Sequence, residues 1–386
     1  MRWVFPDPND REENTARDAV RGRIDAWWQA FAENAGAIDA AFRGGPDFEL
    51  VEFMQGTLQT IDENLMWEYG PALRGDGHRL AISPESEYGL HPLTAEILAR
   101  APELKRFEFY HGRPAEGPNW AIRSVEARVG VDVGKGSIRV DVGENNRVDT
   151  LFFFPGVNDP ETSRNAAFVA AESLFGEQLL DRWVGVIDAL ERPEGEGWMP
   201  FLDAADALQR GIKTVRESLP DTPWSQWLDD TAWTTLQINT AEEEREPTGW
   251  SDLLVATTPH VGITQALVQG TLFHSGRYSR FDEKFCYLKL DESELEGDER
   301  FERRRPLEDE LDAALREAGL GCLGGGGSGV WFGYSLLALT DVPAAIPLIR
   351  ELARRHDAPG NSWLCFADFD WCAEWVGIWD DTPPPP

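Results

Sequence analysis

The order of apolar patterns in the last hundred residues is the strongest constraint on what this chain can fold into. Runs of aliphatic and aromatic residues alternate there with segments in which apolar residues recur every three or four positions, the spacings of buried strands and amphipathic helices. This β-α-β-β-α-β order, with an indistinct middle pair of strands, predicts a split-βαβ, ferredoxin-like domain with helices covering one face of a sheet. The predicted elements are a strand at 285–290, a helix at 307–318, a strand at 330–339, a helix at 343–352 and a strand at 362–369.

The first half of the chain also mixes helices and strands. Apolar residues at helical spacing predict one or two helices within residues 13–42. Two alternating segments, 127–133 and 137–142, are separated by Gly-Lys-Gly, a spacer of hairpin length, so we expect them to pair antiparallel. The fold class predicted for the whole chain is therefore α+β, with mixed or antiparallel sheets covered by helices.

The length of the chain favours two domains. Single cores usually stop growing near ~250–300 residues, and this chain has 386. The segment Pro-Asp-Thr-Pro at 220–223 is the best boundary, which gives α+β domains at 1–220 and 224–386. The second domain is expected to carry two acidic loops and a short proline tail, at residues 242–247, 291–305 and 383–386.

The charge of the chain excludes whole classes of partner. Sixty-eight Asp and Glu residues against 36 Lys and Arg give a formal net charge of −32. Such a surface repels phosphate backbones and anionic lipid headgroups and attracts basic partners. We therefore expect a basic protein as partner, and neither nucleic acid nor membrane.

The compartment is predicted from what the sequence lacks. No signal sequence is recognised and no apolar run approaches the ~20 residues of a membrane span. The four cysteines lie in the last quarter without Cys-x-x-Cys spacing, as expected for free thiols in a reducing cytoplasm. The six histidines are scattered, so we expect neither a metal site nor a cofactor.

The most conspicuous local motif is the glycine-rich run at residues 324–329. It follows a predicted helix and precedes an aromatic strand, the reverse of the order in phosphate-binding loops, and no Lys-Ser/Thr pair follows it. We interpret it as a flexible, hairpin-like connection or a close backbone approach to a ligand or partner. Gly326 and Gly327 are accordingly candidate binding residues.

Three tryptophans near the C-terminus share a spacing that two structures explain equally well. Trp371, Trp375 and Trp379 would lie on one face of an extended strand, and also on one face of a helix. Either structure produces an aromatic stripe, which belongs to the core or forms an exposed recognition surface. Both alternatives stay open at this point.

Two groups of polar residues are candidates for catalysis. Asp368 and Asp370 have the i, i+2 spacing that places carboxylates on one face of a strand, where they could divide acid and base roles or hold a cation. His111 and Arg113 end an aromatic strand, and Glu68 is expected in the same sheet. In a chain this acidic such pairs also arise by chance.

Two resemblances add to these patterns. The segments 67–71, 80–85, 100–104, 107–114 and 176–190 resemble uncharacterised bacterial proteins of a domain-of-unknown-function family, a resemblance that implies no activity. The second half, with its glycine run before an aromatic strand, is similar to small bacterial immunity proteins that neutralise toxins.

The sequence thus supports two functions from different classes. The first is a non-enzymatic acidic protein that binds a basic protein partner, as an immunity protein does. The alternative is a carboxylate-dependent, metal-assisted hydrolase. The oligomeric state and the identity of any substrate stay open.

Overall fold

The computed structural model describes residues 1–386 except 240–244 and 298. The chain divides into two compact units, Met1–Asp141 with Asp149–Gln209, and Val142–Val148 with Arg210–Pro386. The division falls inside helix α6 (Ala204–Ser218), so the segment 220–223 lies within the second unit. No helix among the described residues is both long and apolar enough to cross a membrane.

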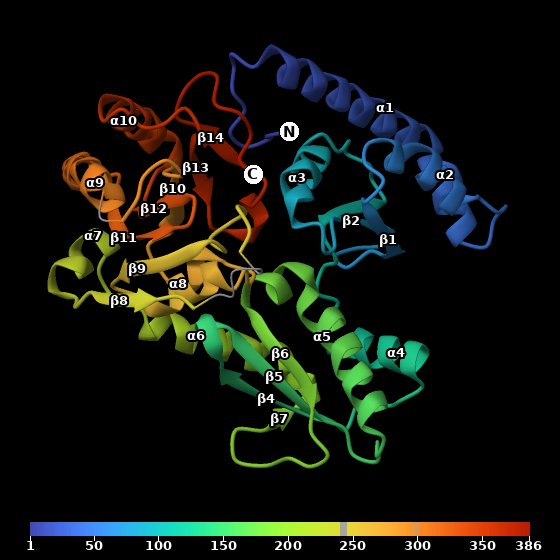
Figure 1. Ribbon diagram of the computed structural model, residues 1–386. Helices are drawn as coiled ribbons and strands as arrows, with labels where there is room; N and C mark the ends of the chain where they lie inside the picture. The colour runs from blue at the N-terminus through green and yellow to red at the C-terminus, as the bar shows by residue number, and fades with distance from the viewer. Residues whose placement is uncertain (240–244, 298) are drawn as a thin grey trace. The chain divides into compact units, whose positions relative to one another are not determined.

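The first unit begins with helices packed on a three-stranded sheet (Figure 1). Its elements are α1 (Arg11–Phe42), α2 (Leu50–Thr57), β1 (Met66–Pro71), β2 (His78–Ser83), α3 (His91–Ala99) and β3 (Phe107–His111). Asp10 caps α1 at its N-terminus, and Trp28 and Phe31 on its buried face make edge-to-face contacts with Phe109 of β3. The helix predicted within residues 13–42 is confirmed as a single one. Strand β2 pairs antiparallel with β1 and parallel with β3.

The rest of the first unit is built around a four-stranded sheet in the order β6-β5-β4-β7. The hairpin predicted from residues 127–133 and 137–142 is wrong, because the first segment begins as helix. Pro118 starts that helix and Gly130 ends it in the left-handed conformation, with φ +77°, a backbone stop that outweighs the alternation of valines. The elements are α4 (Pro118–Val129), β4 (Ser137–Val142), β5 (Val148–Phe153), α5 (Pro160–Trp183), β6 (Val184–Ala189) and β7 (Met199–Pro200).

The second unit contains a seven-stranded sheet in the order β14-β13-β10-β12-β11-β9-β8. Its inner part, β13-β10-β12-β11, is antiparallel throughout and has the strand order 4-1-3-2 of a β-α-β-β-α-β unit. The predicted ferredoxin-like order is therefore confirmed. Strand β14 extends the sheet on one side, and β9 and β8 extend it on the other.

The bounds of most of these elements follow the apolar patterns closely, but two segments predicted as loops, the charged segment and the glycine run, are not loops. The charged segment 291–305, predicted as a loop, is helical from Glu299 onward; in the loop predicted at 242–247, residues 242–244 lie outside the described residues. The elements are α7 (Trp224–Trp227), β8 (Thr234–Gln237), β9 (Leu253–Thr258), α8 (Val261–Val268), β10 (Lys284–Asp291), α9 (Glu299–Glu317), β11 (Gly321–Gly329), β12 (Phe332–Leu339), α10 (Val342–Arg355), β13 (Ser362–Phe366) and β14 (Trp375–Gly377).

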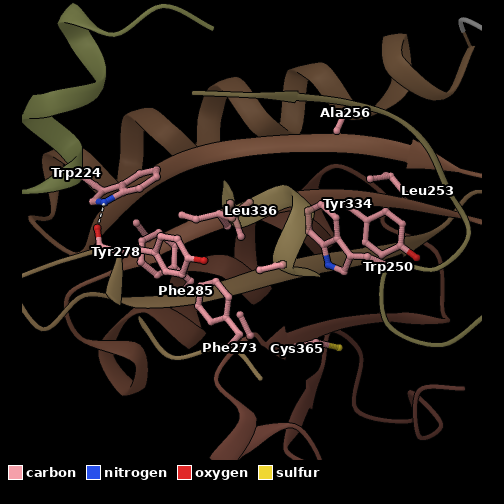
Figure 2. Packing of buried hydrophobic residues seen from close by; sticks show 14 of the residues in the cluster. Trp224, Trp250, Leu253, Ala256, Phe273, Tyr278, Phe285, Tyr334, Leu336 and Cys365 are labelled. Atoms are coloured by element: carbon pink, nitrogen blue, oxygen red, sulfur yellow. Dashed lines mark hydrogen bonds between the residues drawn. The ribbon is translucent and has the colours of Figure 1, made fainter. Parts of the chain in front are cut away.

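One face of this sheet is covered by an aromatic core (Figure 2). Phe273 and Tyr278 stack with ring centroids 4.9 Å apart, and Trp224 meets Phe285 edge to face. The Trp224 indole N–H donates to the carbonyl oxygen of Tyr278 at 3.1 Å, so this buried ring keeps a hydrogen-bond partner. Many of the chain's tryptophans and phenylalanines are thus used in packing.

The glycine run, predicted as a flexible loop, is instead part of strand β11, which pairs with β12 on one side and β9 on the other. The reason is steric. A Cβ atom at Gly326 would lie 2.6 Å from the carbonyl oxygen of Tyr334, and one at Gly327 would lie 2.5 Å from that of Val255. Glycine here permits close backbone approach, and ladders on both sides offset its low strand propensity.

Replacing Gly327 by Ala is predicted to lower the free energy of unfolding of the second unit by about 1–3 kcal/mol, because the new Cβ forces backbone shifts. Chemical denaturation monitored by tryptophan fluorescence measures the change. Gly56→Ala in α2, where a Cβ meets open space, is the control and should leave stability unchanged or raise it by up to about 1 kcal/mol. Equal effects of the two substitutions would contradict the steric account.

Candidate functional site

A groove of about 430 Å³ lies beside the glycine strand in the second unit. Strands β11 and β9 form its floor and helix α9 forms one wall. Gly326 and Gly327, the two glycines predicted to bind a partner, both line it. Other lining residues include Trp233, Val255, Thr257, Phe301, Arg304 and Ser328.

The strand register places side chains from three strands on the groove side of the sheet. Residues directly opposite each other in an antiparallel pair point to the same face. The facing pairs are Val255 with Ser328 and Gln237, and Thr257 with Gly326 and Thr235. We call these six residues the open face, because the four that lie on β8 and β9 are all exposed to solvent.

The wall formed by α9 is held by buried charges. The Arg304 guanidinium contacts Glu292 and Glu308, each at 2.9 Å, and donates to the hydroxyl of Ser328 at 3.1 Å. Burial raises the pKa of Glu292, although Arg304 opposes this shift. Ser335 of β12 also donates to Glu308, at 2.7 Å. Helix α9 is therefore fixed to the sheet, and the groove is a preformed feature.

Two aromatic side chains stand at the edges of the groove. Phe301 on α9 is 52% exposed and Trp233, which precedes β8, is 44% exposed. Exposed carboxylates accompany both: Glu296 adjoins the groove-lining Gly297, and Asp230 lies three residues before Trp233. The groove thus combines solvent-exposed aromatic rings with nearby carboxylates, and the Arg305 guanidinium lies over the Phe301 ring, 6.0 Å from its centroid.

The three C-terminal tryptophans share neither a helix nor a strand. Trp371 ends a short 3₁₀ helix, Trp375 begins β14, and Trp379 follows that strand. All three are half-buried. Trp371 lies beneath the Lys284 ammonium, 4.9 Å from the ring centroid, and Trp379 donates to the carbonyl oxygen of Ala358 at 2.8 Å. Their contacts are those of packing residues.

Asp368 and Asp370 occupy different environments. Asp368 is 1% exposed and accepts hydrogen bonds from the backbone N–H and hydroxyl of Ser275, at 2.5 and 2.7 Å, and from Lys284 at 3.1 Å. Burial alone would raise the pKa of Asp368, but the hydrogen bond from His274 and the charge of Lys284 outweigh it and lower that pKa to about 2. Asp370 lies in the following 3₁₀ helix and is half-buried. A carboxylate satisfied in this way anchors the 274–275 segment to β13.

This arrangement predicts that Asp368→Asn lowers stability by about 3 kcal/mol, because it removes the charge that compensates Lys284 in a buried network. Thermal unfolding measures the loss. Asp380→Asn, at a carboxylate that pairs with Arg350 and Arg354 on the surface, should leave the melting temperature nearly unchanged. An unchanged melting temperature in Asp368→Asn would argue for a role other than anchoring.

Another pocket, of about 480 Å³, lies in the first unit and is lined by His111 and Arg113 among other residues. The structure brings Glu68 to 3.5 Å from Arg113, so part of the predicted constellation does converge. Arg113 also contacts Glu85 at 2.6 Å and Glu172 at 3.1 Å. Its charge is therefore engaged by three carboxylates, as in an ion-pair network that ties loops together.

His111 pairs with a second histidine that sequence reasoning did not single out. Its Nε2 lies 3.1 Å from Nδ1 of His91, so one imidazole donates to the other. Burial lowers the pKa of each to about 4, and the positive charge of Arg182 acts in the same direction. The pair links the start of α3 to the end of β3.

The sign of the resulting pH dependence follows from these pKa values. The unfolded chain takes up protons on both histidines as the pH falls below about 6.5, whereas the folded chain resists protonation down to about 4. The contribution of these two histidines to the stability of the first unit is therefore fully present above pH 6.5 and is lost progressively between pH 6.5 and 4.

Calorimetric melts between pH 7.5 and 4.5 test this dependence. His111→Gln should flatten it, since the variant has one buried imidazole fewer. His356→Gln, which changes a histidine bonded to Glu310 in the second unit, is the control and should leave the dependence of the first unit unchanged. A slope identical in wild type and His111→Gln would refute the role of the pair.

Among the described residues, no three or more His, Cys, Asp or Glu side chains are arranged to hold a metal ion. The four cysteines are free thiols, three of them buried and Cys372 exposed. Comparison of the chain with protein-family models, curated proteins and solved structures finds no match.

Sequence reasoning missed Trp233, Val255 and Phe301. Trp233 and Val255 lie in or next to short apolar segments, where such a residue is ordinarily taken as core, and Phe301 lies within the charged segment 291–305, predicted as a loop. The position of β8 and β9 beyond helix α9 leaves Val255 exposed, and that arrangement has no local sequence signal.

Proposed function

We propose that this chain is a non-enzymatic acidic protein that binds a basic protein partner. The observation that carries the proposal is the open face beside the glycine strand, with the exposed rings of Trp233 and Phe301 at its edges. Exposed aromatic residues around a preformed groove are typical anchors of protein interfaces. The partner docks there and covers them.

The charge of the chain supports a basic partner. A formal net charge of −32 steers a positively charged protein toward the surface and accelerates encounter. The carboxylates near the groove, Glu296 and Asp230 among them, then lie beside basic side chains of the bound partner.

We propose that binding neutralises the activity of the partner. The resemblance of the second half to bacterial immunity proteins supports a partner whose toxic activity is blocked by the complex. An immunity protein requires no chemistry of its own, which agrees with an interface built from packing and charge.

The alternative function, a carboxylate-dependent and metal-assisted hydrolase, draws support from the pocket that His111 and Arg113 line in the first unit. Its charged groups are less suited to catalysis than to structure, since Arg113 is engaged by Glu68, Glu85 and Glu172. Asp368 is similarly engaged and almost fully buried. We therefore prefer the binding protein.

Affinity capture tests the proposal. The immobilised chain is incubated at 50 mM NaCl with extract of its own cells, and each captured protein is purified and titrated by calorimetry. We expect a basic protein that binds with a defined stoichiometry and whose affinity falls by roughly tenfold or more at 300 mM NaCl, because screening weakens charge attraction. Its own activity should be inhibited in the complex.

The control is the double variant Trp233→Ala, Phe301→Ala, which keeps the net charge and removes both exposed rings. It should capture the partner weakly or not at all. Captured proteins that are acidic, or binding that is indifferent to salt, would count against the proposal.

A further inference from the structure

We infer that the open face receives one amphipathic α-helix of the partner, laid alongside helix α9 and carrying Lys and Arg on its outward side. The inference rests on the proposed function and specifies the binding element. It follows from the dimensions of the face, from its side chains and from its charge.

The dimensions come from the layer that already covers part of this face. Helix α9 lies over β11 with Leu307, Leu311 and Leu315 buried beneath it, and α10 packs beside α9 (Figure 1). Strands β9 and β8 continue the sheet beyond α9 with exposed side chains. Two strands at ~4.8 Å spacing are about 10 Å wide, which matches the ~10 Å diameter of a helix.

The side chains of the open face suit a helix. Val255, 37% exposed, lies between Gln237 and Ser328 in the register, and the pair Thr235 and Thr257 comes next along the strands. Phe301 rises from α9 on one side of this surface and Trp233 stands by the edge strand on the other.

A strand added to the free edge of β8 would use the surface differently. It would pair with the backbone of β8 in the plane of the sheet and leave the side chains of Val255 and Thr257 in water. A helix lying on the face covers these side chains together with Phe301. A helix therefore covers more of the exposed apolar side chains than an added strand would.

The charge selects a foreign, basic helix over a second copy of this chain. Two copies with a formal net charge of −32 each repel one another, whereas Lys and Arg on a helix are attracted by this charge, and those at the borders of its apolar side lie toward exposed carboxylates such as Glu296 and Glu302. The partner element is thus apolar toward the sheet and basic toward solvent.

Two fluorescent 18-residue peptides of identical Leu, Ala, Lys and Arg composition test the inference. One places its leucines on a single helical face and the other disperses them. Anisotropy titrations at 50 mM NaCl should show the amphipathic peptide binding about tenfold more tightly or better, with a rise in helicity by circular dichroism.

Substitutions locate the binding site. Val255→Asp, Phe301→Ala and their double variant should weaken binding of the amphipathic peptide by about fivefold or more each. Val186→Asp and Phe168→Ala change residues that are similarly exposed, 54% and 52%, in the first unit and should leave the affinity within about twofold. Thermal melts verify that each variant is folded.

Three results would overturn the inference. Equal affinity for both peptides, unaffected by Val255→Asp, means attraction by charge alone and leaves the proposed function standing. Binding of neither peptide refutes the helix, and refutes the proposed function only if affinity capture also yields no basic protein. Sedimentation equilibrium showing a dimer that Val255→Asp dissociates would assign the face to self-association.

Discussion

The close approach of strand β11 to its two neighbours is the contact on which the rest of the second unit depends. It joins the four strands of the ferredoxin-like unit to the extension formed by β9 and β8. Because Gly326 and Gly327 carry no side chains, the backbones of Tyr334 and Val255 can lie against them. One steric requirement, the close backbone approach at Gly326 and Gly327, therefore accounts for the continuous sheet on which the groove lies.

Several buried charges of the second unit are compensated locally, and this compensation decides how those polar residues are to be understood. Asp252 is fully buried and accepts from the backbone N–H groups of Trp331 and Phe332 at 2.8 and 3.2 Å. Asp368 and Arg304 have comparable sets of partners. Each of these side chains fixes one segment to another. Removing its charge from water costs free energy, and the hydrogen bonds and ion pairs that it makes offset this cost. Charged groups that are paired in this way stabilise the fold. Binding of a partner therefore depends on the exposed side chains.

The order of strands and helices in the last hundred residues could be predicted because it rests on local periodicity, which survives in the folded chain. The glycine strand could not, since its pairing depends on partners that come from β9 and β12. The wrong hairpin at 127–133 has a similar origin: alternating valines indicated a strand, but the stop at Gly130 sets a helix. Of the candidate site residues, Gly326 and Gly327 lie in the groove by virtue of a motif visible in the sequence, whereas the exposure of Val255 is a tertiary property.

Exposed apolar side chains beside an edge strand ordinarily invite self-association, because β8 is the edge of the sheet among the described residues and Val255 and Phe301 offer apolar surface. A formal net charge of −32 opposes that association at long range, where copies of the chain first meet. The same charge attracts a basic protein and so allows the face to stay open to one kind of partner. The acidity of the chain and its exposed aromatic residues look unrelated in the sequence, but they act together in the proposed binding. The charge selects a basic partner, and packing against the aromatic residues stabilises the complex.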